Sequence, residues 1–72
     1  MMTDNKIEKI GVLIKQIRKE QGLSQEQLAA TAGVGVRFIR ELEKGKASCH
    51  MGKALTVISM LGIDVMIGDK VL

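Results

Sequence analysis

Positively charged side chains cluster in one short stretch of this sequence and are its clearest chemical feature. The cluster consists of Arg37, Arg40, Lys44 and Lys46. A guanidinium group donates paired hydrogen bonds that fit a phosphate or the edge of a base, whereas an ammonium group acts as a point charge. Such a cluster suits the binding of a polyanion. The alternative is a solvated helix face, which is the commoner origin of a charge run.

Residues that support catalysis or metal binding are sparse. Cys49 and His50 are the single cysteine and the single histidine, and neighbours on a helix point apart. The segment Gly33-Val34-Gly35 matches part of a phosphate loop but lacks the third glycine and the Lys-Ser/Thr pair. We therefore expect no catalytic residue, no metal and no cofactor, and we interpret the chain as a non-enzyme.

Composition limits the chain to one small folded domain. The 72 residues are 46% hydrophobic and 26% charged, which is typical of globular rather than disordered proteins. Residues 1–46 carry the whole net charge of +3, because residues 47–72 are neutral. A lone cysteine cannot form an internal disulfide, and no apolar run is long enough to cross a bilayer. We expect a reducing cytosolic setting and no membrane partner.

Helical periodicity and a glycine predict the first element, a helix over residues 6–20 that ends at Gly22. Apolar residues recur at steps of three and four, and basic residues occupy the other faces. The apolar stripe is Ile7, Ile10, Ile14 and Ile17, with Leu13 beside it, and the outward cations are Lys9, Lys15, Arg18 and Lys19.

Two short helices follow, separated by a glycine turn. Ser24 and Gln27 have the spacing of a capping box, so a second helix begins after Ser24 and ends at Gly33. A third helix is predicted over residues 36–44, and Gly45 ends it. The buried positions are Leu28, Ala29 and Ala32 in the second helix, and Phe38, Ile39 and Leu42 in the third.

The last third of the chain predicts one more helix and a strand. Ser48 or His50 caps the helix, which ends at Gly62. Its apolar stripe is Met51, Ala54, Leu55, Ile58 and Leu61. Residues 63–67 alternate and are rich in β-branched types, which favours a strand. Because no second strand is evident, we expect it to pair across a symmetric dimer, through Ile63, Val65, Met66 and Ile67.

Two short helices joined by a glycine turn, the second with exposed arginines, are typical of the helix-turn-helix unit that enters the DNA major groove. The stretch resembles the Xre/Cro-type family of phage and bacterial repressors. Its sequence is SQEQLAATAGVGVRFIRELEKGK, with Gln25, Leu28-Ala29, Gly33, Ile39, Glu43 and Gly45 at the family spacing. The helix and strand that follow, within residues 8–67, narrow the resemblance toward HipB-type antitoxins, which GVRFIRELEKGK also resembles.

The resemblance implies an all-α, four-helix, lambda-repressor-like domain spanning residues 1–72. Its helix-turn-helix core is residues 7–62, and the strand at 63–67 pairs across a homodimer. It further implies an autoregulating repressor on a palindromic double-stranded operator, associated with the nucleoid in the cytoplasm, and a HipA-type kinase toxin as a candidate partner. A solitary regulator and a module that mainly holds a toxin are the alternatives.

The resemblance also assigns roles along the third helix. Base contacts fall to Gly35, Val36, Arg37, Arg40 and Glu41, and phosphate contacts to Gln25, Lys44 and Lys46. Many relatives have Ser or Thr at the turn and then Gln, where this chain has Gly35 and Val36. Arg37 can grip guanine, Val36 can pack on a thymine methyl, and Arg40 can reach a base or a phosphate. Glu43 is expected to brace the end of this helix against the body.

Overall fold

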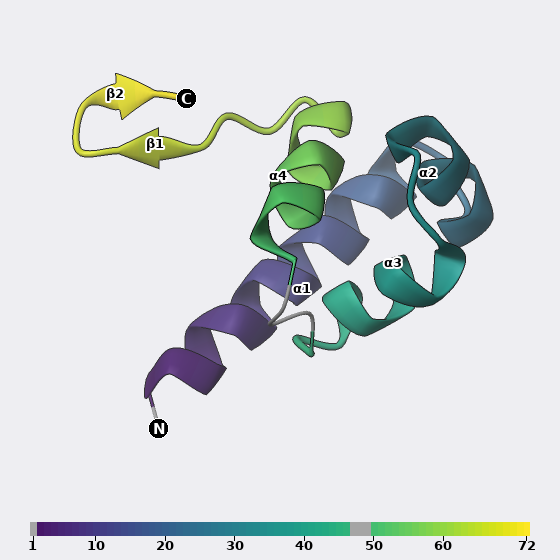
Figure 1. The fold of residues 1–72 in the computed structure, drawn as a ribbon, viewed down its shortest axis with the longest axis horizontal. Coiled ribbons are helices and arrows are strands. Elements are labelled where there is room, and N and C mark those ends of the chain that lie inside the picture. Colours follow the sequence, from purple (N-terminus) through teal and green to yellow (C-terminus); the bar gives the residue numbers. More distant parts are fainter. Residues whose placement is uncertain (1, 47–49) are drawn as a thin grey trace.

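The protein is described by a computed structural model covering residues 2–46 and 50–72, with side chains from Lys6 onward. Within these residues the predicted four helices are confirmed, and a two-stranded hairpin follows them (Figure 1). No helix in these segments has the length and apolar character needed to cross a membrane. The elements are α1 (Met2–Glu20), α2 (Gln25–Ala32), α3 (Val36–Glu43), α4 (Met51–Met60), β1 (Met66–Ile67) and β2 (Lys70–Val71).

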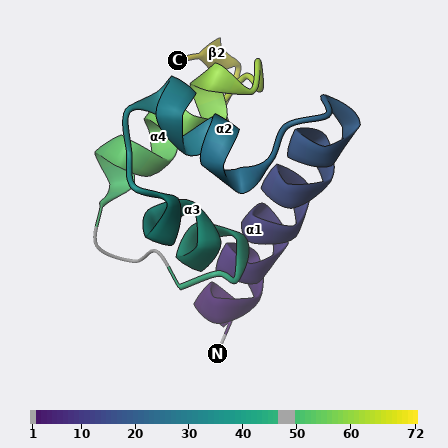
Figure 2. The same cartoon turned by 90° about the vertical axis from the view of Figure 1, so that its right-hand side faces the viewer.

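The core is small and aliphatic, and every helix contributes to it. The fully buried large side chains are Ile14 from α1, Leu28 from α2, Ile39 from α3 and Val57 from α4. In Figure 2, α1 runs along one side of the molecule with α3 beside its N-terminal part, α2 lies above α3, and α4 lies on the opposite side. These four side chains meet in one cluster. Their packing fixes each helix relative to the other three.

Local signals fix where α2 begins and where it ends. The hydroxyl of Ser24 accepts from the backbone N–H of Gln27 at 3.0 Å, and the Gln27 carbonyl oxygen Oε1 accepts from the N–H of Ser24 at 2.8 Å. This confirms the predicted capping box. At the other end of α2, Gly33 has φ +72°, a left-handed conformation that disfavours residues with a Cβ. The chain therefore reverses within a few residues and starts α3 at Val36.

The buried face of α1 is the predicted one at Ile14 and Ile17 but not at Ile10. Ile10 and Leu13 are 46% and 54% exposed, whereas Gly11 is buried. A Cβ on Gly11 would lie 2.6 Å from the carbonyl oxygens of both Leu42 and Glu43, so α3 ends directly against α1. The helix turns Gly11 rather than Ile10 toward the body because only glycine permits this approach.

The C-terminal strand also differs from the prediction, because it finds its partner in the same chain. Only Met66–Ile67 of the predicted 63–67 strand is extended in β1, and it pairs antiparallel with β2 in the register Met66↔Val71 and Ile67↔Lys70. Gly68, at φ +64°, begins the two-residue turn. The expectation that another molecule must satisfy the strand was wrong, since Gly68-Asp69 is itself a hairpin signal.

Helix α4 confirms the expected stripe in part, because Leu61 is buried and Ala54 and Ile58 pack against the core. Val57 is fully buried, while Met51 and Leu55 are 76% and 38% exposed. His50 occupies the N-cap position, but its side chain makes no capping hydrogen bond. The other proposed cap, Ser48, lies outside the described residues, as does Cys49. Part of the predicted core stripe therefore remains on the surface.

The contact at Gly11 predicts a large effect from one methyl group. Gly11→Ala should lower the free energy of unfolding by about 1–3 kcal/mol, because the clash with α3 outweighs the better helix propensity of alanine. Urea unfolding checks this. Gly52→Ala is the control, since nothing lies within 4 Å of its added Cβ, and it should leave stability unchanged or slightly raised. Equal effects of the two substitutions would contradict the close approach.

Candidate nucleic-acid interface

Helix α3 separates cations from apolar residues. Ile39 and Leu42 are buried in the core, whereas Arg37 and Arg40 are exposed on the outer side. Lys44 and Lys46, just beyond the end of the helix, are exposed too. All four predicted cations are therefore exposed, and the spacing of Arg37, Arg40 and Lys44 places these three on one side of α3. Such an array provides the positive potential that a phosphate backbone requires.

The remaining predicted base-contact residues lie on the same helix or at its start. Gly35 is the N-cap in an extended conformation, and its backbone is exposed. Val36 opens the helix and is half-buried. Glu41 pairs with Arg37, with 3.5 Å between its Oε2 and the arginine Nε. The five residues Gly35, Val36, Arg37, Arg40 and Glu41 thus belong to one continuous helical segment.

A buried ion pair holds α3 against the rest of the molecule. Arg18 and Glu43 are only 6% and 8% exposed, and the arginine Nε donates to Oε2 of Glu43 at 2.6 Å. Nη2 of Arg18 donates to Oε1 at 3.2 Å, and Nη1 donates to the carbonyl oxygen of Leu23 at 2.7 Å. The sequence prediction placed Arg18 on an outer face and was wrong. The predicted bracing role of Glu43 is confirmed.

Gln25 joins this network from the start of α2. Its Nε2 donates to Oε1 of Glu43 at 3.0 Å, so the side chain predicted to clamp a phosphate points partly inward. The carboxamide nitrogen carries a second N–H that this bond leaves for another acceptor. This hydrogen bond connects the first turn of α2 to the last turn of α3, to which Glu43 belongs.

One cation beside α3 escaped the sequence analysis. Nζ of Lys53, in the first turn of α4, lies 6.0 Å from the centroid of the Phe38 ring. His50 meets the same ring edge-on, with centroids 6.4 Å apart. The sequence did offer one signal for Lys53. A lysine in the first turn of a helix is unfavourable because its charge opposes the helix dipole, and such a position calls for another reason for the lysine. Lys53 extends the cationic surface from α3 onto α4.

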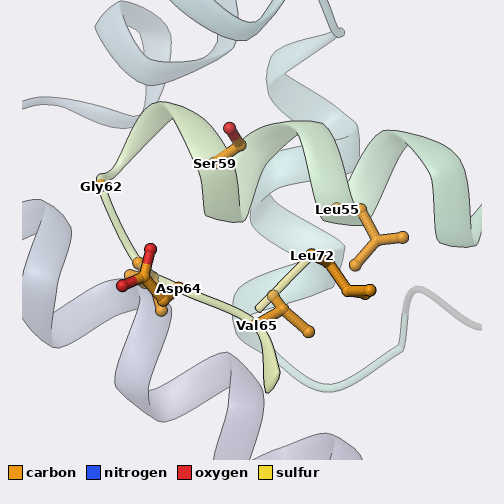
Figure 3. Close-up of a pocket in the computed structure, with 7 residues that line it drawn as sticks. Leu55, Ser59, Gly62, Asp64, Val65 and Leu72 are labelled. Atoms are coloured by element: carbon orange, nitrogen blue, oxygen red, sulfur yellow. The ribbon is translucent and has the colours of Figure 1, made fainter. Parts of the chain in front are cut away.

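Outside α3, metal-binding groups or hollows in the described part of the chain would indicate another kind of site. Residues 2–46 and 50–72 contain no group of three or more His, Cys, Asp or Glu side chains that could hold a metal ion. A hollow of about 310 Å³ lies between α4 and the C-terminal segment, bordered by Leu55, Val65 and Leu72 (Figure 3). Its lining contains one carboxylate, Asp64, and none of the predicted DNA contacts.

Two short helices at a fixed angle, with cations on the outer side of the second, define a helix-turn-helix unit. Comparison with known families agrees, because the helix-turn-helix family HTH_3 matches residues 14–65. The chain belongs to this Xre-type helix-turn-helix family. Proteins of the family are DNA-binding transcriptional regulators rather than enzymes.

Two relatives support this assignment. The chain is 50% identical over 56 residues to the uncharacterized HTH-type transcriptional regulator y4mF of Sinorhizobium fredii, a match covering 78% of this chain and 74% of that protein. It also resembles the crystal structure of the restriction-modification controller protein C.AhdI from Aeromonas hydrophila. That match has a TM-score of 0.74 and 27% identity, and covers 82% of this chain and 89% of the other. The lambda-repressor-like fold is thereby confirmed.

The buried ion pair predicts a large difference between single and double replacement. Arg18→Met should lower the free energy of unfolding by about 3–5 kcal/mol, because it leaves the Glu43 carboxylate buried without a counter-charge. Arg18→Met combined with Glu43→Leu should recover most of this loss, since no charge is then buried. Thermal unfolding of both variants provides the measurement. A double variant no more stable than the single one would contradict this account.

Proposed function

We propose that the protein is a sequence-specific DNA-binding repressor that places α3 in the major groove and acts on the chromosome within the cytoplasm and nucleoid. The supporting observation is the exposed cationic face of α3, held in a fixed orientation by the buried pair between Arg18 and Glu43. An exposed charge run on a loosely held helix would be a solvated surface. When the buried side of the helix is held in place, the exposed charged side chains have defined positions relative to the rest of the molecule.

The proposed contacts follow from the chemistry of each exposed group. Arg37 is the reader of guanine, because its guanidinium can bond O6 and N7 together. Val36 packs on a thymine methyl, and Gly35 allows the backbone to come close to the base edges. Arg40 is the other base-facing residue, and Glu41 lies behind these residues, next to Arg37. The phosphate contacts are Gln25, Lys44 and Lys46, which contribute affinity without sequence choice.

A homodimer on a palindromic operator is the second part of the proposal. A symmetric dimer reads two half-sites about one helical turn, roughly 34 Å, apart. Met66 and Ile67 on the hairpin are 57% and 66% exposed, an unfavourable state for apolar side chains in water. Ile63 and Val65 are half-buried against their own chain, so they contribute less free surface. Hairpin edges also retain backbone groups that a second copy can pair.

The surrounding surface supports the same interface. Leu55, Val65 and Leu72 converge around the hollow beside α4 (Figure 3), and Leu72 is 71% exposed. The hairpin and this hollow are continuous along the C-terminal segment. Burying them together would remove a larger apolar area from water than the hairpin alone provides.

A narrower role, as the autoregulating antitoxin of a HipBA-like pair, is favoured by the same apolar C-terminal surface. The part of this surface that a homodimer leaves uncovered offers a docking area for a HipA-type kinase toxin, separate from the cationic face of α3. The alternative is a solitary regulator without a toxin, and the match to a restriction-modification controller is compatible with it. Purification from the native cell separates the two: a kinase-sized protein that co-purifies supports the antitoxin, and its repeated absence supports the solitary regulator.

The DNA-binding proposal predicts a specific preference for one duplex. The protein should bind DNA from upstream of its own gene about 10³-fold or more tightly than a scrambled duplex of equal composition, at two salt concentrations. Arg37→Gln should lower this ratio, because it removes the bidentate donor. Fluorescence anisotropy measures both. Equal, salt-sensitive binding to the two duplexes would overturn sequence-specific recognition and direct attention to a protein partner.

The dimer proposal predicts that a charge on the hairpin dissociates the protein. Ile67→Lys should shift the sedimentation coefficient from dimer to monomer, because the ammonium group would be buried in the interface. Val12→Lys on α1 is the matched control, since Val12 is 61% exposed and Ile67 is 66% exposed. The control should remain dimeric. A wild-type chain that sediments as a monomer at micromolar concentration would overturn the dimer.

A further inference from the structure

Glu41 is an anion on a surface that otherwise gathers cations. It lies on α3 one turn after Arg37 and one residue from Arg40, and its side chain is 46% exposed. Glu43, two residues later, is buried and braces the fold through Arg18. Glu41 has no such structural role, and an exposed ion pair between neighbouring turns stabilises a fold very little. A carboxylate here also repels the phosphates that the surrounding cations attract.

The geometry of its ion pair suggests what Glu41 does. Its Oε2 faces Nε of Arg37 at 3.5 Å, on the inner edge of the guanidinium. The two terminal nitrogens, Nη1 and Nη2, are left for other partners. Those nitrogens form the fork that bonds O6 and N7 of guanine. Because the Arg37 side chain is 86% exposed, it would otherwise sample many directions, including those that reach phosphates.

We propose that Glu41 is a specificity-determining residue that positions Arg37 for guanine and weakens its contact with phosphates. The inference rests on the proposed function and adds how discrimination arises. Specificity is a difference between two affinities, so weakening the wrong complex raises it as surely as strengthening the right one. On operator DNA, Arg37 stays in its ion pair with Glu41 and reads guanine. On other DNA, Arg37 reaches a phosphate only by leaving Glu41, and the carboxylate remains near the backbone.

Glu41→Gln provides the decisive variant. The amide keeps the size of the side chain but removes the charge that holds Arg37 and repels phosphate. Glu20→Gln is the control, because Glu20 is an exposed acid at the end of α1 and the substitution changes the net charge equally. Both variants should unfold at the wild-type temperature, since neither carboxylate is buried.

The experiment selects duplexes from a random library with the wild type, and measures affinity for the selected duplex and for a scrambled one. Glu41→Gln should bind the scrambled duplex more tightly, with a salt dependence steeper by about one phosphate contact. Its ratio of selected to scrambled affinity should fall about five- to tenfold, whereas Glu20→Gln should keep the wild-type ratio. In an Arg37→Gln background, Glu41→Gln should not change the base preference further, because it acts through Arg37.

The outcomes separate the inference from the function on which it rests. A wild-type protein that selects no sequence would overturn both. If the wild type selects a sequence but Glu41→Gln and Glu20→Gln have the same ratio of selected to scrambled affinity, the proposed role of Glu41 is wrong. The proposal that the protein is a repressor would be unaffected. The inference would also be overturned if Glu41→Gln changed the base preference of a protein that already carries Arg37→Gln, since Glu41 would then contact a base itself.

Discussion

The orientation of α3 depends on one buried carboxylate. Glu43 receives hydrogen bonds from Arg18 on α1 and from Gln25 on α2, and so joins three helices at a single group. Aliphatic side chains alone tolerate small shifts between helices, because their contacts have no direction. A bidentate ion pair fixes direction as well as distance. We infer that the core supplies the stability of this domain, and that Glu43 fixes the angle at which α3 faces outward.

The same region shows why a glycine lies in the middle of α1. Gly11 allows the backbone of α1 to meet the last carbonyl groups of α3, and this approach brings Arg18 within reach of Glu43. A larger side chain at position 11 would separate the two helices. The ion pair therefore depends on the close approach, although the two involve different turns of α1.

Local signals predicted most of the fold, and the errors fall where a residue depends on distant partners. The capping box at Ser24 and the glycine at the end of α2 are encoded within a few residues, so α2 and α3 were placed correctly. Arg18 was placed on the wrong face, because its partner Glu43 is 25 positions away in the sequence and arginine is usually a surface residue. The spacing of Gly11, Ile14 and Arg18 on one face was the overlooked signal. The exposed cations of α3 could be listed from sequence, but the inward bond of Gln25 required the tertiary structure.

The arrangement of the molecule fits recognition of two half-sites by a dimer. The hairpin lies on the far side of α4 from α3 (Figure 1), and the hollow is lined by residues of α4 and the C-terminal segment, so self-association through them leaves α3 uncovered. Half-sites about 34 Å apart require each α3 to lie about 17 Å from the two-fold axis. The molecule measures 30 × 27 × 21 Å, so a distance of that size fits within one protomer. A dimer joined through α3 itself would bury the charges that attract DNA, whereas one joined through the C-terminal segment leaves both cationic faces available to one duplex.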